Sequence, residues 1–290
     1  MKKPPLLYFR SNNQNSISKL NTQKTSVDVF VPQQLPYPYN LQKSNTPRWD
    51  WCLIINDLIS NYINNYGNWE SHLSSIYCHL IKEGDTVLDA GANIGGHTLD
   101  FAYLVGETGK VIAFEPQSYI FNILTTNILI NGLTSRVKQH NLGLSNNNTP
   151  LEVIDERDKY DNGLVNYGGR EIGSKGEGNG EEVIVTTIDA LKLKTLNFLK
   201  MDIQGLELEA LEGGNVTIQK HKPIIFIENY AHHKHKKDIK VIKVLKNLNY
   251  IGYRSTFNNQ DDCIFIYKND KSKLVSLFEK LNITEQFKLI

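Results

Sequence analysis

The chain contains little cysteine and carries almost no net charge, and both absences narrow the classes of protein to which it can belong. Its 3 cysteines, Cys52, Cys78 and Cys263, lie far apart and match no metal-binding spacing. We therefore expect idle or buried thiols in a reducing compartment, and no metal site. The 32 Lys and Arg residues nearly balance the 31 Asp and Glu residues, which leaves a net charge of +1. Bulk electrostatics thus favours neither nucleic acid nor an anionic membrane as a partner, although a local basic patch is compatible with it.

Long apolar runs are also missing. No stretch approaches the roughly 20 residues that a membrane-spanning helix needs. The opening MKKPPLLYFR holds lysines but no apolar segment of signal-peptide length, so we expect a cytoplasmic protein without a membrane partner. What is present is ordinary for a soluble protein. Of 290 residues, 40% are apolar and 22% charged, which suits one large domain with an appendage or two small domains.

The N-terminal part changes character near residue 47. Residues 1–46 are rich in Asn, Gln, Ser and Pro, which predicts an extended or partly disordered arm. From Trp49 on, apolar residues recur at spacings of three and four in WDWCLIINDLISNYINNY, which predicts an amphipathic helix. Residues 68–81 read as a second helix. We therefore expect N-terminal helices over residues 47–82, followed by one domain over residues 83–290.

That domain alternates short apolar strands with helices. Strands are predicted at 85–91, 110–116, 136–144, 196–205, 222–230, 250–256 and 261–269. Helices are predicted at 96–105, 118–130, 206–220, 237–249 and 272–281. Repeated strand–helix units indicate an α/β fold, with a mostly parallel seven-stranded sheet and helices on both faces. The last two strands leave no room for a helix between them, so one strand is expected to run antiparallel.

The helix expected between the third and fourth strands is missing. Residues 155–182 are polar instead, and they contain seven glycines. A long segment of this kind in a compact domain is often a lid or a substrate loop, and we favour that interpretation over a variable surface insertion.

The turn after the first strand reads VLDAGANIGGHTLDFA, residues 87–102. A dinucleotide fingerprint, G-x-G-x-x-G, needs a glycine in the middle so that a pyrophosphate can approach the backbone. Asn93 stands at that position, and its side chain would crowd a diphosphate. S-adenosylmethionine (SAM) has no phosphate, so this turn favours SAM over a nicotinamide cofactor.

Each end of that cofactor has a candidate partner. Asp89 can hold the methionine ammonium, directly or through water, and Gly91 allows close backbone approach. The amides of Gly95–His97 can face the carboxylate at a helix start. Glu115, followed by Pro116, ends the second strand and can accept both ribose hydroxyls. Glu115 serves SAM or NAD equally, but it would repel the 2′-phosphate of NADP.

Three motifs in order resemble the FkbM family of SAM-dependent methyltransferases. They are GDTVLDAGANIGGHTLDFA, VIAFEPQ and FLKMDIQGLELEALEG, and the resemblance covers roughly residues 69–268. It implies a Rossmann-like class I methyltransferase fold. It also implies SAM as the methyl donor and a hydroxyl acceptor on a sugar, glycan or other small metabolite.

One position departs from the family pattern. The motif D.EG.E usually carries Glu where this chain has Gln204, while Asp202, Gly205 and Glu207 are retained. The loss of one carboxylate weakens the case for a divalent metal and leaves the catalytic role of the position open. We expect Gln204 to contact the substrate.

Candidate catalytic residues follow the fourth and fifth strands. Asp202 is expected at a strand tip facing the methyl group, as a general base and a cofactor contact; alternatively, it caps the following helix. His232 and His233 are alternative bases in the segment AHHKHKK, whose simpler interpretation is a solvated basic loop. Glu207 is expected to be a first-turn helix acid or a partner of a nearby backbone amide. Glu228 ends an apolar strand and is expected to accept a substrate hydroxyl, or else to be a paired structural group.

The remaining candidates lie on loops. Asn141 and Leu142 follow the third strand, where methyltransferases hold the adenine. Asn166 and Tyr167 lie on the glycine-rich loop, where amide and phenol groups would suit a sugar acceptor; an ordinary turn is the alternative. The complete set expected to bind the cofactor is Asp89, Gly91, Asn93, Gly95, His97, Glu115, Pro116, Asn141, Leu142 and Asp202.

The sequence therefore predicts a SAM-dependent O-methyltransferase that acts on a sugar, glycan or similar small metabolite. Two alternatives stay open. An NAD-dependent sugar oxidoreductase is disfavoured by Asn93 and by the loop tyrosine Tyr167, which is followed four residues later by Glu171 and not by a lysine. A SAM-binding module without turnover is left open by Gln204.

Overall fold

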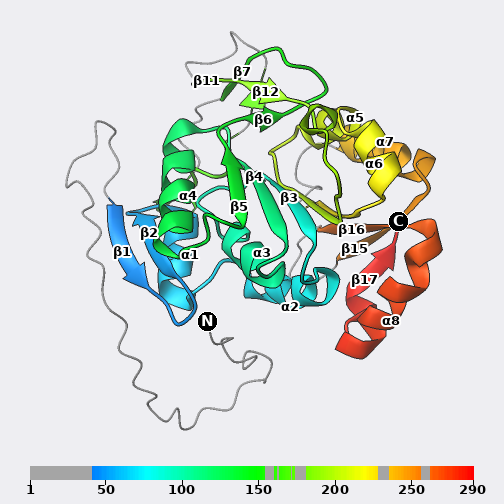
Figure 1. The fold of residues 1–290 in the computed structure, drawn as a ribbon, viewed down its shortest axis with the longest axis horizontal. Helices are drawn as coiled ribbons and strands as arrows, with labels where there is room; N and C mark the ends of the chain where they lie inside the picture. Colours follow the sequence, from blue (N-terminus) through cyan, green and yellow to red (C-terminus); the bar gives the residue numbers. More distant parts are fainter. Residues whose placement is uncertain are drawn as a thin grey trace.

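A single eight-stranded sheet organises the chain in the computed structural model, which describes residues 41–153, 160–161, 163–170, 172–173, 181–227, 235–255 and 262–290 (Figure 1). Its strand order is β17-β15-β16-β14-β13-β3-β4-β5. The strands are β3 Thr86–Ala90, β4 Lys110–Phe114, β5 Val137–His140, β13 Phe198–Met201, β14 Ile224–Ile227, β15 Tyr250–Ser255, β16 Cys263–Tyr267 and β17 Phe287–Leu289.

The predicted mixed α/β fold with a mostly parallel sheet is confirmed. Strands β5, β4, β3, β13 and β14 pair in parallel, and β16 pairs antiparallel with both β14 and β15. The predicted number of seven strands was one too few, because β17 adds an antiparallel edge strand beside β15. This strand is only three residues long. It is held by tertiary packing, since the ring of Phe287 stacks on Phe278 with centroids 4.3 Å apart.

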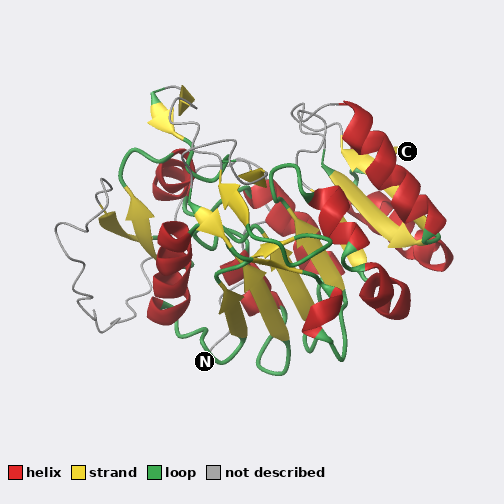
Figure 2. Ribbon diagram, turned by 90° about the horizontal axis from the view of Figure 1, so that it is seen from above, coloured by secondary structure: helices red, strands yellow, loops and turns green. Residues whose placement is uncertain are grey.

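Helices cover both faces of the sheet, as Figure 2 shows from above. They are α1 Leu58–Tyr66, α2 Ser71–Leu80, α3 Thr98–Leu104, α4 Ser118–Ile130, α5 Glu207–Glu212, α6 Asn215–His221, α7 His235–Asn247 and α8 Lys271–Leu281. Neighbouring residues of β13 belong to two different buried clusters, Phe198 to one and Leu199 to the other. A strand buried on both faces reads as a continuous apolar run, which explains why these strands were found from sequence.

One predicted helix is broken in two. The segment expected as a helix over residues 206–220 forms α5 and α6, separated at Gly213 and Gly214. A Cβ atom at Gly213 would overlap the carbonyl oxygen of Ser145, so the backbones of these two segments lie in close contact. A glycine inside a helical pattern can mark such an approach, but the period of the apolar residues does not reveal it.

The prediction of a helix starting at Trp49 was wrong. Residues Asp50–Ile54 form strand β2, which pairs antiparallel with β1, Leu41–Asn45. Helix α1 begins only at Leu58, after the N-cap residue Asp57. The strand conformation is fixed by α4, because the backbone N–H of Cys52 donates to Oδ1 of Asn127 at 2.6 Å. The described part of the expected arm is therefore a strand, and residues 1–40 lie outside the described residues.

The polar segment after β5 is built from very short strands. Gly143–Leu144 (β6) pairs in parallel with Val185–Thr186 (β12). The strand Leu151–Val153 (β7) lies between Ile172–Gly173 (β10) and Glu182–Val183 (β11), and Tyr160–Asp161 (β8) pairs with Leu164–Val165 (β9).

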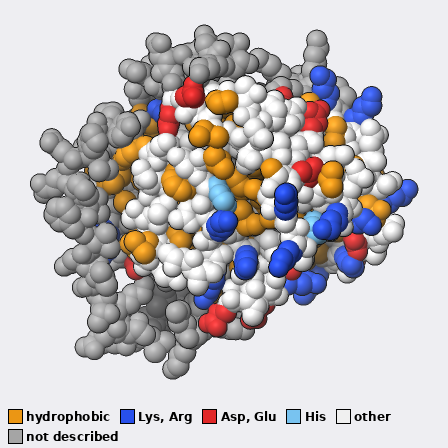
Figure 3. Space-filling view, turned by 45° about the horizontal axis from the view of Figure 1, so that its top comes forward, with side chains coloured by type: hydrophobic (Ala, Val, Ile, Leu, Met, Phe, Trp, Pro, Cys, Tyr) orange, Lys and Arg blue, Asp and Glu red, His pale blue; other side chains and the backbone are white. Residues whose placement is uncertain are grey.

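The three cysteines are free thiols, and Cys78 is half-buried. Cys52 and Cys263 are buried, and burial raises the pKa of the Cys52 thiol to about 11. On the face shown in Figure 3, hydrophobic side chains gather near the middle, and Lys and Arg side chains lie mostly in the lower and right-hand parts. No helix within the described ranges combines the length and the apolarity required to cross a bilayer.

Candidate active site

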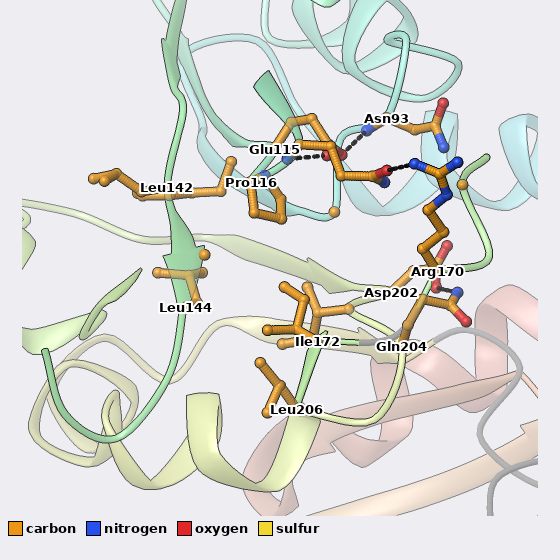
Figure 4. A pocket seen from close by; sticks show the side chains of 16 residues that line it. Asn93, Glu115, Pro116, Leu142, Leu144, Arg170, Ile172, Asp202, Gln204 and Leu206 are labelled. Carbon is orange, nitrogen blue, oxygen red and sulfur yellow. Dashed lines mark hydrogen bonds between the residues drawn. The ribbon is translucent and has the colours of Figure 1, made fainter. Parts of the chain in front are cut away.

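A pocket lies at the edge of the sheet where β3, β4 and β13 end (Figure 4). Ligands of open parallel sheets bind beyond the carboxyl ends of the strands, which is where this pocket is found. The residues that line it include Gly91, Asn93, Glu115, Pro116, Gln117, Leu142, Leu144, Gly168, Arg170, Ile172, Asp202, Gln204 and Leu206.

Gly91 brings two strands together at the base of the pocket. Its φ is +78°, and a Cβ atom there would overlap the backbone carbonyl oxygen of Asp202. Its N–H donates to the carbonyl oxygen of Phe114 at 3.0 Å. Only glycine fits a position that combines a positive φ with such close backbone approach. The Gly91 backbone therefore does approach another group closely, as expected, but that group is the backbone of Asp202 at the end of β13.

Glu115 is fixed by the loops on either side of it. Its Oε2 accepts a hydrogen bond from the N–H of Asn93 at 3.0 Å, and its Oε1 accepts one from the N–H of Gln117 at 2.9 Å. Only 4% of the residue is exposed. Burial raises the pKa of Glu115 to about 7, and the two N–H donors oppose that rise. Each carboxylate oxygen can accept a further hydrogen bond from a ligand in the pocket.

Asp202 and Gln204 line the opposite side of the pocket. Nε2 of Gln204 donates to Oδ1 of Asp202 at 2.6 Å. The Asp202 side chain is 26% exposed, and its Oδ2 lies 3.7 Å from Nζ of Lys200. The alternative in which Asp202 caps the next helix was wrong, because α5 begins at Glu207 with Leu206 as its N-cap. Asp202 is therefore available to a ligand at the strand tip.

Glu207 bonds to backbone amides, as expected from the sequence. Its Oε1 accepts from the N–H of Ile203 at 3.1 Å, and its Oε2 accepts from the N–H of Gly205 at 3.0 Å. Burial raises the pKa of this carboxyl. Glu207 thus fixes the turn that carries Gln204, and it does not line the pocket.

Lys200 is a residue of this site that sequence reasoning missed. It lies in β13, where all four residues are buried, and its Nζ donates to the carbonyl oxygen of Gly91 at 3.2 Å. Nζ is also 3.9 Å from Oδ1 of Asp89. The available signal was the sequence FLKM, in which a charged residue interrupts an otherwise apolar strand, because a buried lysine needs a partner.

Two residues expected at the cofactor lie deeper in the structure. Asp89 is fully buried, and its Oδ2 accepts a hydrogen bond from Oγ1 of Thr98 at 2.6 Å. His97 is also buried, 3.3 Å from Glu70, and its ring stacks on Phe101. Neither side chain is among those that line the pocket. A strand-ending acid and a helix-start histidine can both face inward, and the sequence does not reveal which way they point.

The expected adenine side of the pocket is apolar. Leu142, Pro116, Leu144 and Ile172 line it. Asn141 does not line it, because its amide is used locally: Nδ2 donates to the carbonyl oxygens of Glu115 and Pro116 at 3.0 and 2.9 Å. Asn141 therefore holds the turn that carries Glu115.

The loop of residues 163–170 forms another wall. Asn166 accepts a hydrogen bond from the N–H of Gly169, and the carbonyl oxygen of Tyr167 accepts one from Nε2 of Gln117 at 3.1 Å. The two residues expected to contact a substrate, Asn166 and Tyr167, are not among those that line the pocket, whereas Arg170 does line it. The guanidinium of Arg170 lies 5.0 Å from the centre of the Tyr167 ring and 3.4 Å from Oε1 of Gln117. Sequence analysis named neither Arg170 nor Gln117.

Three candidate residues cannot be placed. Glu228, His232 and His233 fall in residues 228–234, outside the described residues. Within the part of the chain that the structure describes, no group of three or more His, Cys, Asp or Glu side chains is arranged to hold a metal ion.

Comparison with known proteins identifies the family to which the chain belongs. A family model, the methyltransferase FkbM domain, matches residues 89–255, which is more than half of the chain. The chain belongs to the FkbM methyltransferase family. The matched domain is that of SAM-dependent methyltransferases, which does not fit the alternative of an NAD-dependent oxidoreductase.

Individual relatives are more distant. Methyltransferase sdnD of Sordaria araneosa is 29% identical over 154 residues, which are 44% of this chain and 59% of that protein. The chain thus spans little more than half of this curated relative. The structure of methyltransferase FkbM from Methylobacillus flagellatus KT is similar at 22% identity and a TM-score of 0.45, covering 72% of this chain and 52% of its own. A SAM-dependent O-methyltransferase from Thermotoga maritima is similar at 15% identity and a TM-score of 0.39, covering 78% and 77%.

Proposed function

We propose that this FkbM-family enzyme transfers the methyl group of SAM to a hydroxyl of a sugar, glycan or similar small metabolite. The observation that carries the proposal is the position of Asp202. Its carboxylate lines the pocket at a strand tip, beside the Gly91 turn on one side and Gln204 on the other. A carboxylate in that position suits the removal of a proton from an alcohol.

The residues of the pocket fit SAM. Gly91 lines the pocket without a side chain, so we place the cofactor's amino-acid end beside this turn. Glu115 has a fixed carboxylate that can accept the ribose hydroxyls, and Leu142, Pro116 and Ile172 offer apolar contact to a planar base. Asn93 lines the pocket. A diphosphate would need a glycine at this position, because only a residue without a side chain lets the phosphates approach the backbone.

SAM supplies a methyl group on an already activated sulfonium. The protein's part is to align an acceptor oxygen with it and to exclude water, which can supply on the order of 7–11 kcal/mol of the barrier reduction. Asp202 accepts the proton of the acceptor hydroxyl, a contribution of roughly 10²–10⁴-fold. His232 or His233 is the alternative base, and Glu228 is an additional hydroxyl acceptor, in the segment outside the described residues.

The loop of residues 163–170 supports a polyhydroxylated acceptor. Of its side chains, the Arg170 guanidinium lines the pocket, and we place the Asn166 amide and the Tyr167 phenol beside the acceptor. Such groups hydrogen-bond to hydroxyls, and an aromatic ring can pack on the apolar face of a sugar. Gln117 joins this loop to the turn after β4, so cofactor and acceptor would share one wall.

Mass spectrometry tests the proposal directly. The protein is incubated with SAM and a panel of nucleotide-sugars and oligosaccharides, and products heavier by one methylene group are sought. A methylated hydroxyl is the expected result, and Asp202→Asn should slow its formation by roughly 10²-fold or more at neutral pH. SAM binding without transfer to any acceptor would instead favour a binding module, and methylation of a nitrogen or carbon would refute O-methyl transfer.

A further inference from the structure

Lys200 occupies a place that lysine rarely takes. It lies in the centre of the sheet on β13, and its side chain is 3% exposed. A lysine ammonium is costly to remove from water unless carboxylates compensate its charge. An apolar residue would pack between Leu199 and Met201 without that cost. The presence of a charge here therefore calls for an explanation in the chemistry of the site.

Three contacts join this ammonium to the pocket. Nζ donates to the carbonyl oxygen of Gly91 at 3.2 Å, and it lies 3.7 Å from Oδ2 of Asp202 and 3.9 Å from Oδ1 of Asp89. Among the described residues, Oδ1 of Asp89 accepts no hydrogen bond, so Lys200 is what compensates that buried oxygen. One side chain thus connects the end of β3 to the end of β13.

We propose that Lys200 is a positioning residue for methyl transfer: its ammonium keeps Asp202 anionic and holds that carboxylate against the Gly91 turn. The inference rests on the proposed function, in which Asp202 is the base. Lys200 need not touch SAM or the acceptor, because it acts through the Asp202 carboxylate and the Gly91 carbonyl.

The surrounding charges support this role. The charged groups around Asp202, besides Lys200, are Glu115 from the turn after β4, Glu207 from α5 and Arg170, which lines the same pocket; Asp89 on β3 shares Lys200 with Asp202. The charge of Asp202 raises the pKa of Glu115 and of Glu207, whereas Lys200 lowers that of Glu115. Among so many carboxylates, removal of the ammonium would favour the protonated form of Asp202. A protonated Asp202 could not accept the acceptor's proton.

A double-mutant cycle on kcat separates this role from general support of the fold. We expect Lys200→Met to lower kcat by roughly 10²-fold at neutral pH, comparable with Asp202→Asn, because without the ammonium the carboxylate is no longer held against the Gly91 turn; the loss should deepen as the pH falls. In the Asp202→Asn background, Lys200→Met should cost less than about threefold, because residues that act as a unit are not additive. Lys200→Arg should retain more activity than Lys200→Met at every pH.

A carboxyl titration gives a readout that does not require turnover. Carbon-13 NMR of labelled Asp side chains, with the Asp202 signal assigned from Asp202→Asn, should show the Asp202 midpoint at least one pH unit higher in Lys200→Met. If Lys200→Met does not fold, Asp89→Asn combined with Lys200→Met removes the buried charge that it leaves behind, and that protein is titrated instead.

The outcomes are distinct. An unchanged Asp202 midpoint, or an equal loss of kcat with and without Asp202, would overturn the role of Lys200. A raised midpoint in an enzyme whose Asp202→Asn variant keeps full activity would support the electrostatic role of Lys200 but refute Asp202 as the base, and with it the function on which the inference rests.

Discussion

The carboxylate of Asp57 accepts a hydrogen bond from the backbone N–H of Tyr167 at 3.4 Å, and this contact joins α1 to the loop that walls the pocket. The carbonyl oxygen of Asn56 accepts from the N–H of Val165 at 2.9 Å, and Ile59 packs beside Gly168. Asp57 also caps α1 by accepting from the N–H of Ser60. The segment before the methyltransferase core thus supports one wall of the candidate active site.

Replacing Asp57 should therefore affect the acceptor more than the cofactor. Asp57→Ala removes the N-cap of α1, which costs about 0.5–2 kcal/mol of stability. It also releases residues 163–170, so we expect KM for the acceptor to rise by roughly tenfold while the Kd of SAM stays within about twofold. Titration calorimetry and steady-state kinetics measure the two effects. Asn64→Ala, at an exposed position on the same helix, is the control. If Asp57→Ala weakened SAM binding as much as it raised KM for the acceptor, the contact would not act on the acceptor side alone.

SAM binding should depend on pH through Glu115. Burial raises the pKa of this carboxyl from 4.5 to about 7, so its ionised form, the better acceptor for ribose hydroxyls, gains population as the pH rises through 7. SAM affinity should therefore increase between pH 6 and pH 8 by roughly tenfold at most, the limit for one proton over one to two pH units. Glu115→Gln should bind SAM more weakly and without this dependence, as measured by calorimetry at several pH values.

The raised pKa of Glu115 also makes the free energy of unfolding depend on pH. Because its pKa is higher in the folded chain, its contribution to stability is fully present below pH 4.5 and is lost as the pH rises through about 7. Glu115→Gln should flatten the stability of the protein over that window, measured by urea unfolding without SAM. A steeper dependence in the variant would show that another group controls it.

Substitution of Gly91 should destabilise the protein far more than substitution of Gly132, although both glycines have a positive φ. Both Gly91 and Gly132 have a positive φ, of +78° and +67°, but only at Gly91 would a Cβ overlap a described atom. Gly132→Ala should cost about 1–2 kcal/mol for the left-handed backbone alone. Gly91→Ala should cost more and should abolish SAM binding, since Asp202 must move. Similar unfolding midpoints for the two variants would show that the turn can relax.

Gln204→Glu restores the carboxylate that the family usually carries. Nε2 of Gln204 donates to Asp202 at 2.6 Å, so a Glu there would place two carboxylates side by side and raise the pKa of both. We expect kcat at pH 7 to fall by roughly tenfold and to recover as the pH rises. Gln204→Met, which removes the donor without adding charge, is the matched control and should lose activity equally at all pH values.

Much of the fold was predictable because its signals are local. The strands β3, β4, β13 and β14 are short apolar runs, and α4 was predicted at its observed bounds, Ser118–Ile130. Strand β2 was missed because its apolar residues fit a helical spacing equally well. Its conformation depends on β1 and on Asn127, and contacts so distant in sequence leave no period.

The site was predictable where a residue directly ends a strand. Asp202, Glu115 and Gly91 reach the pocket because the carboxyl ends of parallel strands meet at one edge. Asp89 also belongs to a strand end, yet its side chain faces Thr98 inside the protein. Arg170 and Gln117 could not be assigned, because loop conformation decides whether their side chains point into the pocket.

Strand β1 determines how far the chain can be shortened from its N-terminus without promoting self-association. A truncation at residue 46, the limit that composition suggests, would separate β2 from its partner and expose a row of unpaired N–H and C=O groups. Trp51, Leu53 and Ile54 are buried in that strand, so the exposed edge would carry an apolar face prone to self-association. Expression trials should therefore keep residue 41 and vary only what precedes it.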